Sequence, residues 1–312
     1  SLRRRQRQMC IRDRYVDSIE TDALGNLICV KNGTEANPEK IMLSAHMDHI
    51  GYIVTGIEKE GFLRVTNVGG ISPTMSLTRH VSFPNGVQGV VVSEVSKDTA
   101  MKDLFVDIGA QDKADAETMV QIGDVCVYAN DCFQLGANRV ASPAMDDRAA
   151  CALLIRFLQT VGTTKQTIIA VFSVQEEVGC RGAKGAAFQQ EPDIGIVLEG
   201  TTCNDLGDVP ETAHVCEAGQ GVAVSFMDGA SIANRALFRK ALDVAKQENI
   251  PHQVKHSVSG GNDGGAIQRA REGVPVVVLS VPCRYIHSPS SVVKLSDVES
   301  QFALVKALVK AL

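Results

Sequence analysis

The sequence predicts an α/β fold, with a mostly parallel sheet sandwiched by helices and a small inserted β-barrel or PDZ-like domain. Two observations predict it. Apolar strands alternate with helices in the part of the chain that follows Asp146, which is the pattern of a parallel sheet covered on both faces. Between residues 70 and 141, short β-rich pieces are separated by Gly, Asp and Asn, which is typical of a small all-β unit. We therefore expect an α/β domain of residues 15–69 and 142–312, with residues 70–141 inserted into it.

The first half of the chain contains short strand-like segments. Apolar or alternating runs separated by turn residues predict strands, and in chain order they occupy residues 17–21, 26–31, 40–47, 52–57, 61–65, 87–94, 104–108 and 124–128. The last three lie inside the expected insertion.

The second half alternates helices with apolar strands. Helices are expected over residues 149–161 and 230–248, with a final helix to Leu312 for which Ser296 is a plausible N-cap. Between them, apolar runs predict buried strands at residues 166–174, 194–198 and 274–281.

Length and composition limit the possible functions. The 312 residues allow about two domains, and 45% hydrophobic residues are enough for a core. A net charge of −5 and 4% aromatic residues without Trp argue against nucleic-acid binding. No apolar run reaches the ~18 residues of a membrane helix. Nine Cys without a C-x-x-C pair favour reduced thiols in a cytoplasmic protein.

The segment Ser1–Arg14 differs from the rest of the chain. It holds six Arg and one Asp and shows no helical or strand periodicity. It could be a basic arm for an acidic partner, but we expect a non-native leader, a targeting or foreign segment unrelated to the fold. Without it the remaining chain is distinctly acidic.

Two motifs place acids and a histidine where elements begin or end. His46 and Asp48 lie two residues apart on a strand, so their side chains point to one face. His46 could bind a metal while Asp48 fixes its tautomer, although His-x-Asp alone is more often a surface pair. Asp146 and Asp147 precede a helix, where one acid could serve the helix terminus and the other a metal.

Three further residues or pairs follow apolar strands. The adjacent Glu176 and Glu177 repel each other unless a cation or proton lies between them, and a solvated loop is the alternative. Glu199 ends a buried strand and needs a partner; His287 follows the last strand and alone would more often be structural. Because the carboxyl edge of such a sheet is where ligands bind, these residues together predict a site for Zn, Co or Mn.

The motifs AHMDHIG, AMDDR, QEEVGCRGA, VLEGTT, GGNDGGA and RYIHSP occur in an order that resembles the M42 family of metallo-aminopeptidases. This is the glutamyl or tetrahedral aminopeptidase group, some members of which are labelled endoglucanase. The resemblance runs from about Tyr15 to Leu312. It implies a di-metal exopeptidase fold with an inserted domain, two divalent ions (Zn or Co, with Mn possible), peptide substrates, and a homo-oligomer in which dimers assemble into a dodecamer.

The resemblance also implies roles at matched positions. The metal ligands would be His46, Asp146, Glu177, Glu199 and His287. Asp146 would bridge the two ions. Glu176 would be the general base that takes a proton from a water or hydroxide bridging the ions and gives it to the leaving amine. Asp48 would support His46.

The sequence departs from the family pattern at three of these motifs. Glu199 stands where the family usually has Asp, which keeps the carboxylate but lengthens the arm. His49 and Asn262 replace a Glu and a Thr, and neither change removes an implied ligand. The usual N-terminal helix is missing, and Ser1–Arg14 does not replace it.

Other function classes remain open at this point. A di-metal carboxypeptidase or deacylase would reuse the same ligands, and a glycosidase would need two carboxylates without metal. A catalytically impaired fragment that acts as a binding protein would use the β-rich insertion. Assays of free-amine against N-blocked peptides, with and without a chelator, separate these alternatives.

Overall fold

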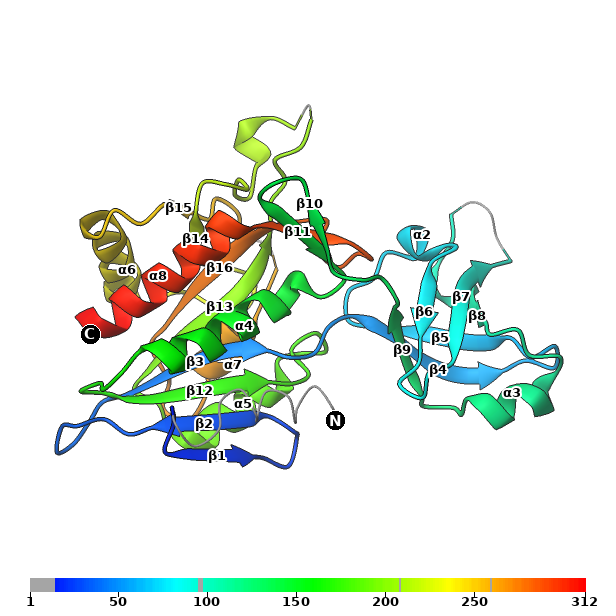
Figure 1. Ribbon diagram of the computed structural model, residues 1–312, viewed down its shortest axis with the longest axis horizontal. Coiled ribbons are helices and arrows are strands. Elements are labelled where there is room, and N and C mark those ends of the chain that lie inside the picture. The colour runs from blue at the N-terminus through cyan, green and yellow to red at the C-terminus, as the bar shows by residue number, and fades with distance from the viewer. Residues whose placement is uncertain (1–14, 95–97, 208, 259) are drawn as a thin grey trace.

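The computed structural model describes residues 15–94, 98–207, 209–258 and 260–312. The segment Ser1–Arg14, expected to be a leader, lies outside the described residues. The described chain forms a large α/β unit and a six-stranded closed barrel, which lies to one side of it in Figure 1. This is the α/β fold with an inserted barrel that the sequence predicts.

An 11-stranded sheet forms the centre of the α/β unit. Its strands are β1 (Ser18–Thr21), β2 (Leu27–Lys31), β3 (Lys40–His46), β10 (Phe133–Leu135), β11 (Arg139–Ser142), β12 (Thr167–Ser173), β13 (Ile194–Thr202), β14 (Val222–Ser225), β15 (His252–Val254), β16 (Val276–Arg284) and β17 (Ser291–Lys294). Their main order is β1-β2-β12-β3-β13-β16-β17-β11-β10, with β14 beside β16 and β15 beside β14. The central strands β12, β3, β13 and β16 run parallel, whereas most flanking pairs are antiparallel. The sheet is therefore mixed rather than mostly parallel.

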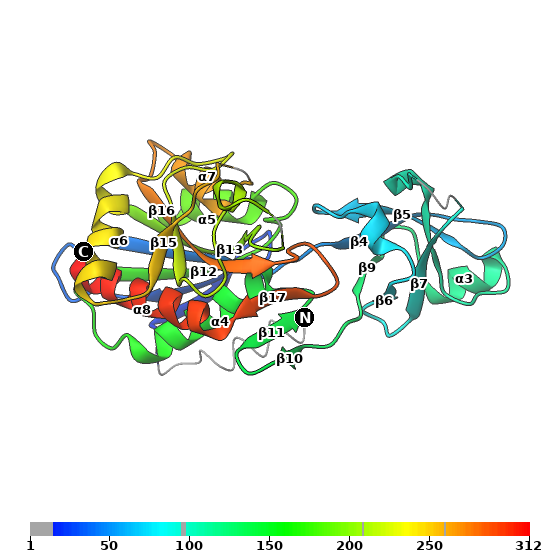
Figure 2. The ribbon, with the colours of Figure 1, turned by 90° about the horizontal axis from the view of Figure 1, so that it is seen from above.

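Helices cover both faces of this sheet. One layer holds α4 (Met145–Thr160), α6 (Arg235–Gln247) and α8 (Leu295–Ala311), and the other holds α5 (Arg181–Gln190) and α7 (Asp263–Gln268), as the view from above shows (Figure 2). None of the helices among the described residues combines the length and the apolar character needed to span a bilayer.

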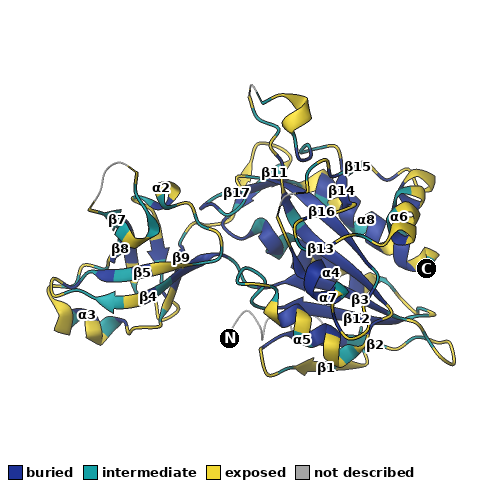
Figure 3. Cartoon of the chain, turned by 180° about the vertical axis from the view of Figure 1, so that it is seen from behind, coloured by how far each residue is buried: buried dark blue, intermediate teal, exposed yellow. Residues whose placement is uncertain are grey.

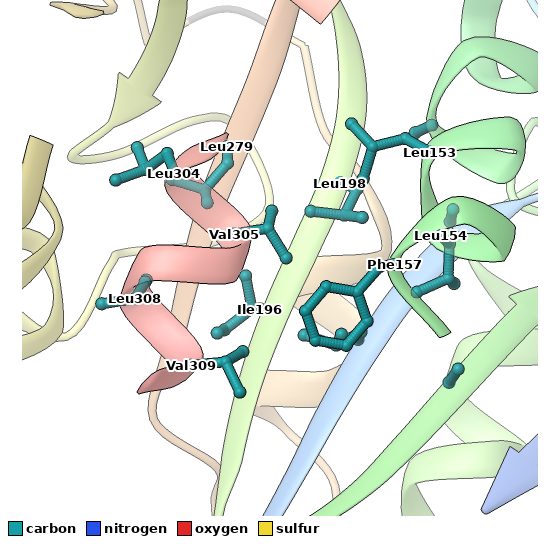
Figure 4. Packing of buried hydrophobic residues seen from close by; sticks show 14 of the residues in the cluster. Leu153, Leu154, Phe157, Ile196, Leu198, Leu279, Leu304, Val305, Leu308 and Val309 are labelled. Carbon is teal, nitrogen blue, oxygen red and sulfur yellow. The ribbon is translucent and has the colours of Figure 1, made fainter. Parts of the chain in front are cut away.

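Strand alternation divides the core between the two layers. On β12, Ile168, Ala170 and Phe172 belong to the cluster under α4 and α8, whereas Ile169 and Val171 pack with α5 and α7. Strand β12 is accordingly buried along its whole length and β3, β13 and β16 are buried except near their ends, while the helices keep exposed outer faces (Figure 3). Figure 4 shows part of the first cluster, with side chains from α4, α8 and β13: Leu153, Phe157, Val305, Ile196 and Leu198.

Helix α6 shows how the sequence specifies one of these helices. The side chain of its N-cap, Asn234, accepts hydrogen bonds from two backbone N–H groups of the first turn. Its buried residues, Leu237, Ala241, Val244 and Ala245, are spaced to form one apolar stripe. The helix was expected from residue 230, and the cap explains its later start.

The predicted N-cap of the last helix is wrong. Helix α8 begins at Leu295 after Lys294, and no side chain caps it. Instead, the buried carboxylate of Asp297 accepts hydrogen bonds from the N–H groups of Gly219 (2.7 Å) and Gly221 (3.0 Å). The first turn therefore fixes a neighbouring loop.

The barrel consists of β4 (Gly51–Ile57), β5 (Leu63–Val68), β6 (His80–Ser82), β7 (Gln88–Ser93), β8 (Leu104–Asp107) and β9 (Val125–Tyr128), closed in the order β4-β5-β8-β7-β6-β9. The short helices α2 (Pro73–Ser76), η1 (Met101–Asp103) and α3 (Lys113–Met119) connect its strands, and η2 (Glu211–Ala213) lies in the α/β unit. Its interior holds a separate apolar cluster, in which Tyr52 and Tyr128 share a hydrogen bond of 2.9 Å between their hydroxyls.

The barrel limits differ from the expected insertion of residues 70–141. Strands β4 and β5, expected in the α/β domain, pair with barrel strands. Strands β10 and β11, expected in the insertion, pair with each other and with β17 of the large sheet. A change in local composition marks where turns become frequent along the chain. It does not reveal with which distant strand a given strand forms hydrogen bonds.

Candidate metal centre

The site lies at the carboxyl ends of the central parallel strands. His46 ends β3, in register with Ser173 of β12, and Glu199 lies near the end of β13. Both side chains continue the row of alternate residues that faces α5 and α7, because Met42 and Val197 belong to the cluster on that side. Parallel strands place their carboxyl ends at one edge, which is where open α/β sheets bind ligands.

Two groups of side chains that could hold a metal ion share Asp146. Its Oδ1 lies 3.4 Å from His46 Nε2, and its Oδ2 lies 3.4 Å from His287 Nε2. His46 Nε2 is also 3.2 Å from Glu199 Oε1, and His287 Nε2 is 3.2 Å from Glu177 Oε2. The ligand atoms within each group of three lie within 4.8 Å of one another. The structure thus brings together all five side chains expected to bind metal, and each oxygen of Asp146 faces a different group.

Glu176 lies beside the first of these groups. Its Oε2 is 4.0 Å from His46 Nε2, and its Oε1 accepts a hydrogen bond from the Cys180 thiol at 3.4 Å. The carboxylate of Asp48 accepts hydrogen bonds from the backbone N–H groups of Glu176 (3.1 Å) and Glu177 (3.2 Å). Asp48 therefore fixes the main chain that carries both glutamates.

Asp48 contacts the His46 ring through its backbone carbonyl group rather than through its carboxylate. His46 Nδ1 lies 3.0 Å from the backbone carbonyl oxygen of Asp48 but 3.7 Å from its carboxylate. A carbonyl oxygen only accepts, so Nδ1 carries the proton and Nε2 is left to face the acids. The main chain, rather than the Asp48 carboxylate, sets the tautomer.

The two adjacent aspartates at the start of α4 have separate partners. Asp146 faces both histidines, whereas Asp147 Oδ2 accepts a hydrogen bond from the backbone N–H of His46 at 3.1 Å. Neither residue is the N-cap, which is Ala144. Asp147 thus ties the start of the helix to the end of β3.

The electrostatics of the site fit divalent cations. Burial raises the pKa of Glu176 to about 8 and that of Glu177 to about 7, and neighbouring acids add to both shifts. Burial also acts on Asp146, but His287 and His46 hold its pKa below the usual range. Within the described part of the chain, Asp146 Oδ1 and Glu177 Oε1 are buried without a hydrogen-bond donor. Since buried carboxylates are costly without a cation or a donor, this set of oxygen and imidazole ligands fits two such ions.

Two glycines leave space directly beside these candidate ligands. A Cβ atom on Gly200 would lie 2.9 Å from Asp146 Oδ1, and one on Gly70 would lie 3.0 Å from His287 Nδ1. Gly70 belongs to the connection that follows barrel strand β5, so the barrel attachment passes against the site.

One buried acid next to the site was not among the residues predicted from the sequence. Asp263, the first residue of α7, accepts hydrogen bonds from the hydroxyls of Ser44 (3.2 Å) and Ser173 (2.5 Å). It groups with Glu176 and Cys180 as a further set of potential ligands. The motif GGNDGGA, which contains Asp263, was the feature of the sequence that could have indicated this residue.

A cavity of about 270 Å³ opens from the site. Its lining comes from the metal-binding groups, from the ends of β13 and β16, and from the segment between β15 and α7: Asp146, Glu176, Glu199, Gly200, Thr201, Thr202, Lys255, Gly260, Gly261, Asn262, Ser280, Ile286 and His287.

Comparison with known proteins identifies the family. Residues 25–304 match the family described as M42 glutamyl aminopeptidase. The chain belongs to this family. Among curated relatives of this M42 aminopeptidase, the lysyl aminopeptidase of Pyrococcus furiosus is 35% identical over 95% of this chain and 88% of its own length. The resemblance drawn from the motifs is thereby confirmed, and the protein is an aminopeptidase of a metallopeptidase family.

Solved structures of similar proteins confirm the fold of this M42 aminopeptidase. An aminopeptidase from the archaeon Desulfurococcus kamchatkensis has a TM-score of 0.93 at 31% identity, covering 98% of this chain and 89% of its own. The TET1 peptidase of Pyrococcus horikoshii has a TM-score of 0.87 at 32% identity, covering 99% and 93%, and is described as able to assemble into a tetrahedron or a large octahedral shell.

Proposed function

We propose that this M42 aminopeptidase uses two divalent metal ions to remove N-terminal residues from peptides. The ligands would be His46 and Glu199 on one ion and His287 and Glu177 on the other, with Asp146 bridging them. The observation that carries the proposal is the position of Asp146, whose two oxygens each lie 3.4 Å from a different histidine. A single ion would leave one of these two groups without a charge partner.

The chemistry divides between the ions and one side chain. When bound, the ions would lower the pKa of a water molecule and polarise the scissile carbonyl. Glu176 accepts the proton of the attacking water and donates it to the amine nitrogen as the C–N bond breaks, which balances the hydrolysis. Asp48 holds Glu176 in place through the backbone N–H.

Several finer properties follow as proposals. Zn or Co suits the ligand set, and Mn is a further candidate. The similarity to the TET1 peptidase supports a homo-oligomer for this chain as well. The eight cysteines among the described residues are free thiols, which supports a cytoplasmic location.

A substrate panel tests the proposal. The metal-loaded protein, prepared separately with Zn, Co and Mn, is expected to cleave aminoacyl chromogenic substrates and free-amine peptides but not N-blocked peptides. A chelator should abolish the activity, and metal addition should restore it. Full activity after complete removal of metal would overturn the di-metal mechanism.

The variant Glu176→Gln tests the acid–base role. It should retain both ions by elemental analysis and lose at least ~10²-fold in kcat, because the amide cannot accept the proton. Glu272→Gln, on an exposed turn, is the matched control and should keep full activity. Wild-type turnover by Glu176→Gln would remove Glu176 from the mechanism.

A further inference from the structure

A buried lysine lines the cavity that opens from the metal-binding groups. Lys255 follows strand β15, and its backbone N–H donates to the carbonyl of Val224 at 3.0 Å. It is only 6% exposed, and among the described lining residues it is the one Lys or Arg. The three acids of the lining, Asp146, Glu176 and Glu199, are the proposed ligands and base. Their charge would be balanced by the ions rather than by Lys255.

Two hydroxyl groups belong to the same cavity lining. Thr201 lies two residues after Glu199 on β13, and Ser280 is paired with Glu199 across to β16, so all three share one face of the sheet. Thr201 and Ser280 are 6% and 2% exposed. Neither hydroxyl makes a hydrogen bond to another group in the part of the chain that the structure describes. The lining thus combines an ammonium with two hydroxyl donors.

The geometry of an exopeptidase determines which part of the substrate meets these donors. The α-amino group and the scissile carbonyl of the first residue both have to reach the ions. The side chain of that residue is therefore carried into the cavity, while the rest of the peptide leaves through its mouth. At ~30 Å³ per water, the volume of about 270 Å³ suits one short side chain with its solvent.

We infer that Lys255, with Thr201 and Ser280, selects peptides whose N-terminal residue is acidic. This inference rests on the proposed function, since it assigns the first side chain to the cavity next to the ions. A carboxylate accepts hydrogen bonds from an ammonium and from hydroxyls. A basic first side chain would place like charges together, which works against binding.

The surroundings of Lys255 support a charged partner. Burial lowers the pKa of Lys255, and the charges of Asp228 and Glu199 oppose that effect. The Asp228 carboxylate is itself held by two N–H groups of its own turn and by the side chains of Ser231 and Asn262. A substrate carboxylate would add a further negative charge beside the buried ammonium and lower the cost of burying it.

Family membership does not settle this point. The matching family is described as glutamyl aminopeptidase, whereas the Pyrococcus furiosus relative is a lysyl aminopeptidase. These activities require first-residue pockets of opposite charge, so the choice has to be made by residues of the individual chain. In this cavity, Lys255 is the residue that selects between an acidic and a basic first residue.

Paired chromogenic substrates test the inference on the metal-loaded protein. Glu and Gln differ in charge but hardly in shape, so the ratio of their kcat/KM values isolates the carboxylate. The wild type should favour Glu over Gln by roughly 10- to 10²-fold, as expected for hydrogen bonds to a charged group. Lys255→Met, which keeps the length of the side chain, should reduce that ratio at least tenfold. Lys255→Arg should retain a preference for Glu.

Controls separate the inference from its assumptions. Lys246→Met, on the exposed side of α6, should leave the Glu/Gln ratio unchanged. Thermal unfolding checks that Lys255→Met is folded, and calorimetry of L-Glu against L-Gln gives a readout without turnover. If the wild type cleaves Gln or Lys substrates as well as Glu, or if Lys255→Met leaves the ratio unaltered, the inference is overturned although the aminopeptidase function stands. If no aminoacyl substrate is cleaved with any metal, the proposed function fails, and equal binding of L-Glu and L-Gln would then overturn the inference as well.

Discussion

Replacing Gly200 by Ala would test the bridging position of Asp146 without altering any ligand. Gly200 lies within strand β13, and its φ is not in the left-handed region. An alanine is therefore compatible with the backbone, and the three atoms nearest to the added Cβ all belong to Asp146. The effect of the substitution should come from the displacement of this one carboxylate.

The size of the displacement follows from the contacts. The added Cβ would lie 2.9 Å from Asp146 Oδ1 and 3.3 Å from its Cβ and Cγ, whereas ordinary van der Waals contact begins at 3.4 Å. The oxygen has to move by about 0.5 Å, which exceeds the ~0.2 Å tolerance of metal–ligand distances. Changes next to a ligand typically cost 10- to 100-fold in metal affinity. We expect a loss of that size, together with a fall in activity at limiting metal.

Metal titration by calorimetry and elemental analysis of the dialysed protein measure this effect. Gly185→Ala is the matched control, because its added Cβ would meet only Leu24 Cδ1 at 3.7 Å inside helix α5. That variant should bind metal normally and gain roughly 0.5–1 kcal/mol in stability from the helical alanine. If Gly200→Ala binds two ions with wild-type affinity and keeps its melting temperature, Asp146 does not bridge them in this geometry.

Two further predictions concern carboxylates that bind backbone N–H groups. Asp48→Asn should lower kcat roughly 10- to 100-fold while metal content stays near two ions, because its amide cannot accept from both Glu176 and Glu177; steady-state kinetics beside elemental analysis measure this, and an unaltered kcat would contradict the positioning role. Asp297→Ala should reduce the free energy of unfolding by about 2–3 kcal/mol, because the N–H groups of Gly219 and Gly221 lose their acceptor. Urea unfolding followed by circular dichroism measures it, and a change below about 0.5 kcal/mol would show that solvent replaces the carboxylate.

The sequence predicts the core of the α/β unit better than its edges. The central strands and α6 follow from uninterrupted apolar runs and from an apolar stripe, which depend only on neighbouring residues. The barrel limits do not follow from local pattern. β4 and β5 alternate like any strand, and only their pairing with β8 and β9 places them in the barrel. Likewise, Ser296 fits a capping signal, but the packing of Asp297 against Gly219 and Gly221 sets where α8 begins.

The candidate site, too, is only partly predictable from the sequence. Residue type predicts some of its members, and only tertiary contacts reveal the others. Acids and histidines at strand ends are visible because a buried carboxylate needs a partner, and the structure brings the expected ones together. The role of the Asp48 carboxylate cannot be predicted from the sequence. This carboxylate accepts hydrogen bonds from backbone N–H groups, which nearly every residue carries, so no residue type marks its partners. Lys255 lies more than fifty residues from Glu199 in the chain and reaches the cavity only through the pairing of β15 with β14 and of β14 with β16. The proposed ligand set can thus be predicted from motifs of this sequence, whereas the proposed charge of the first-residue pocket depends on a single side chain whose sequence context carries no sign of chemistry.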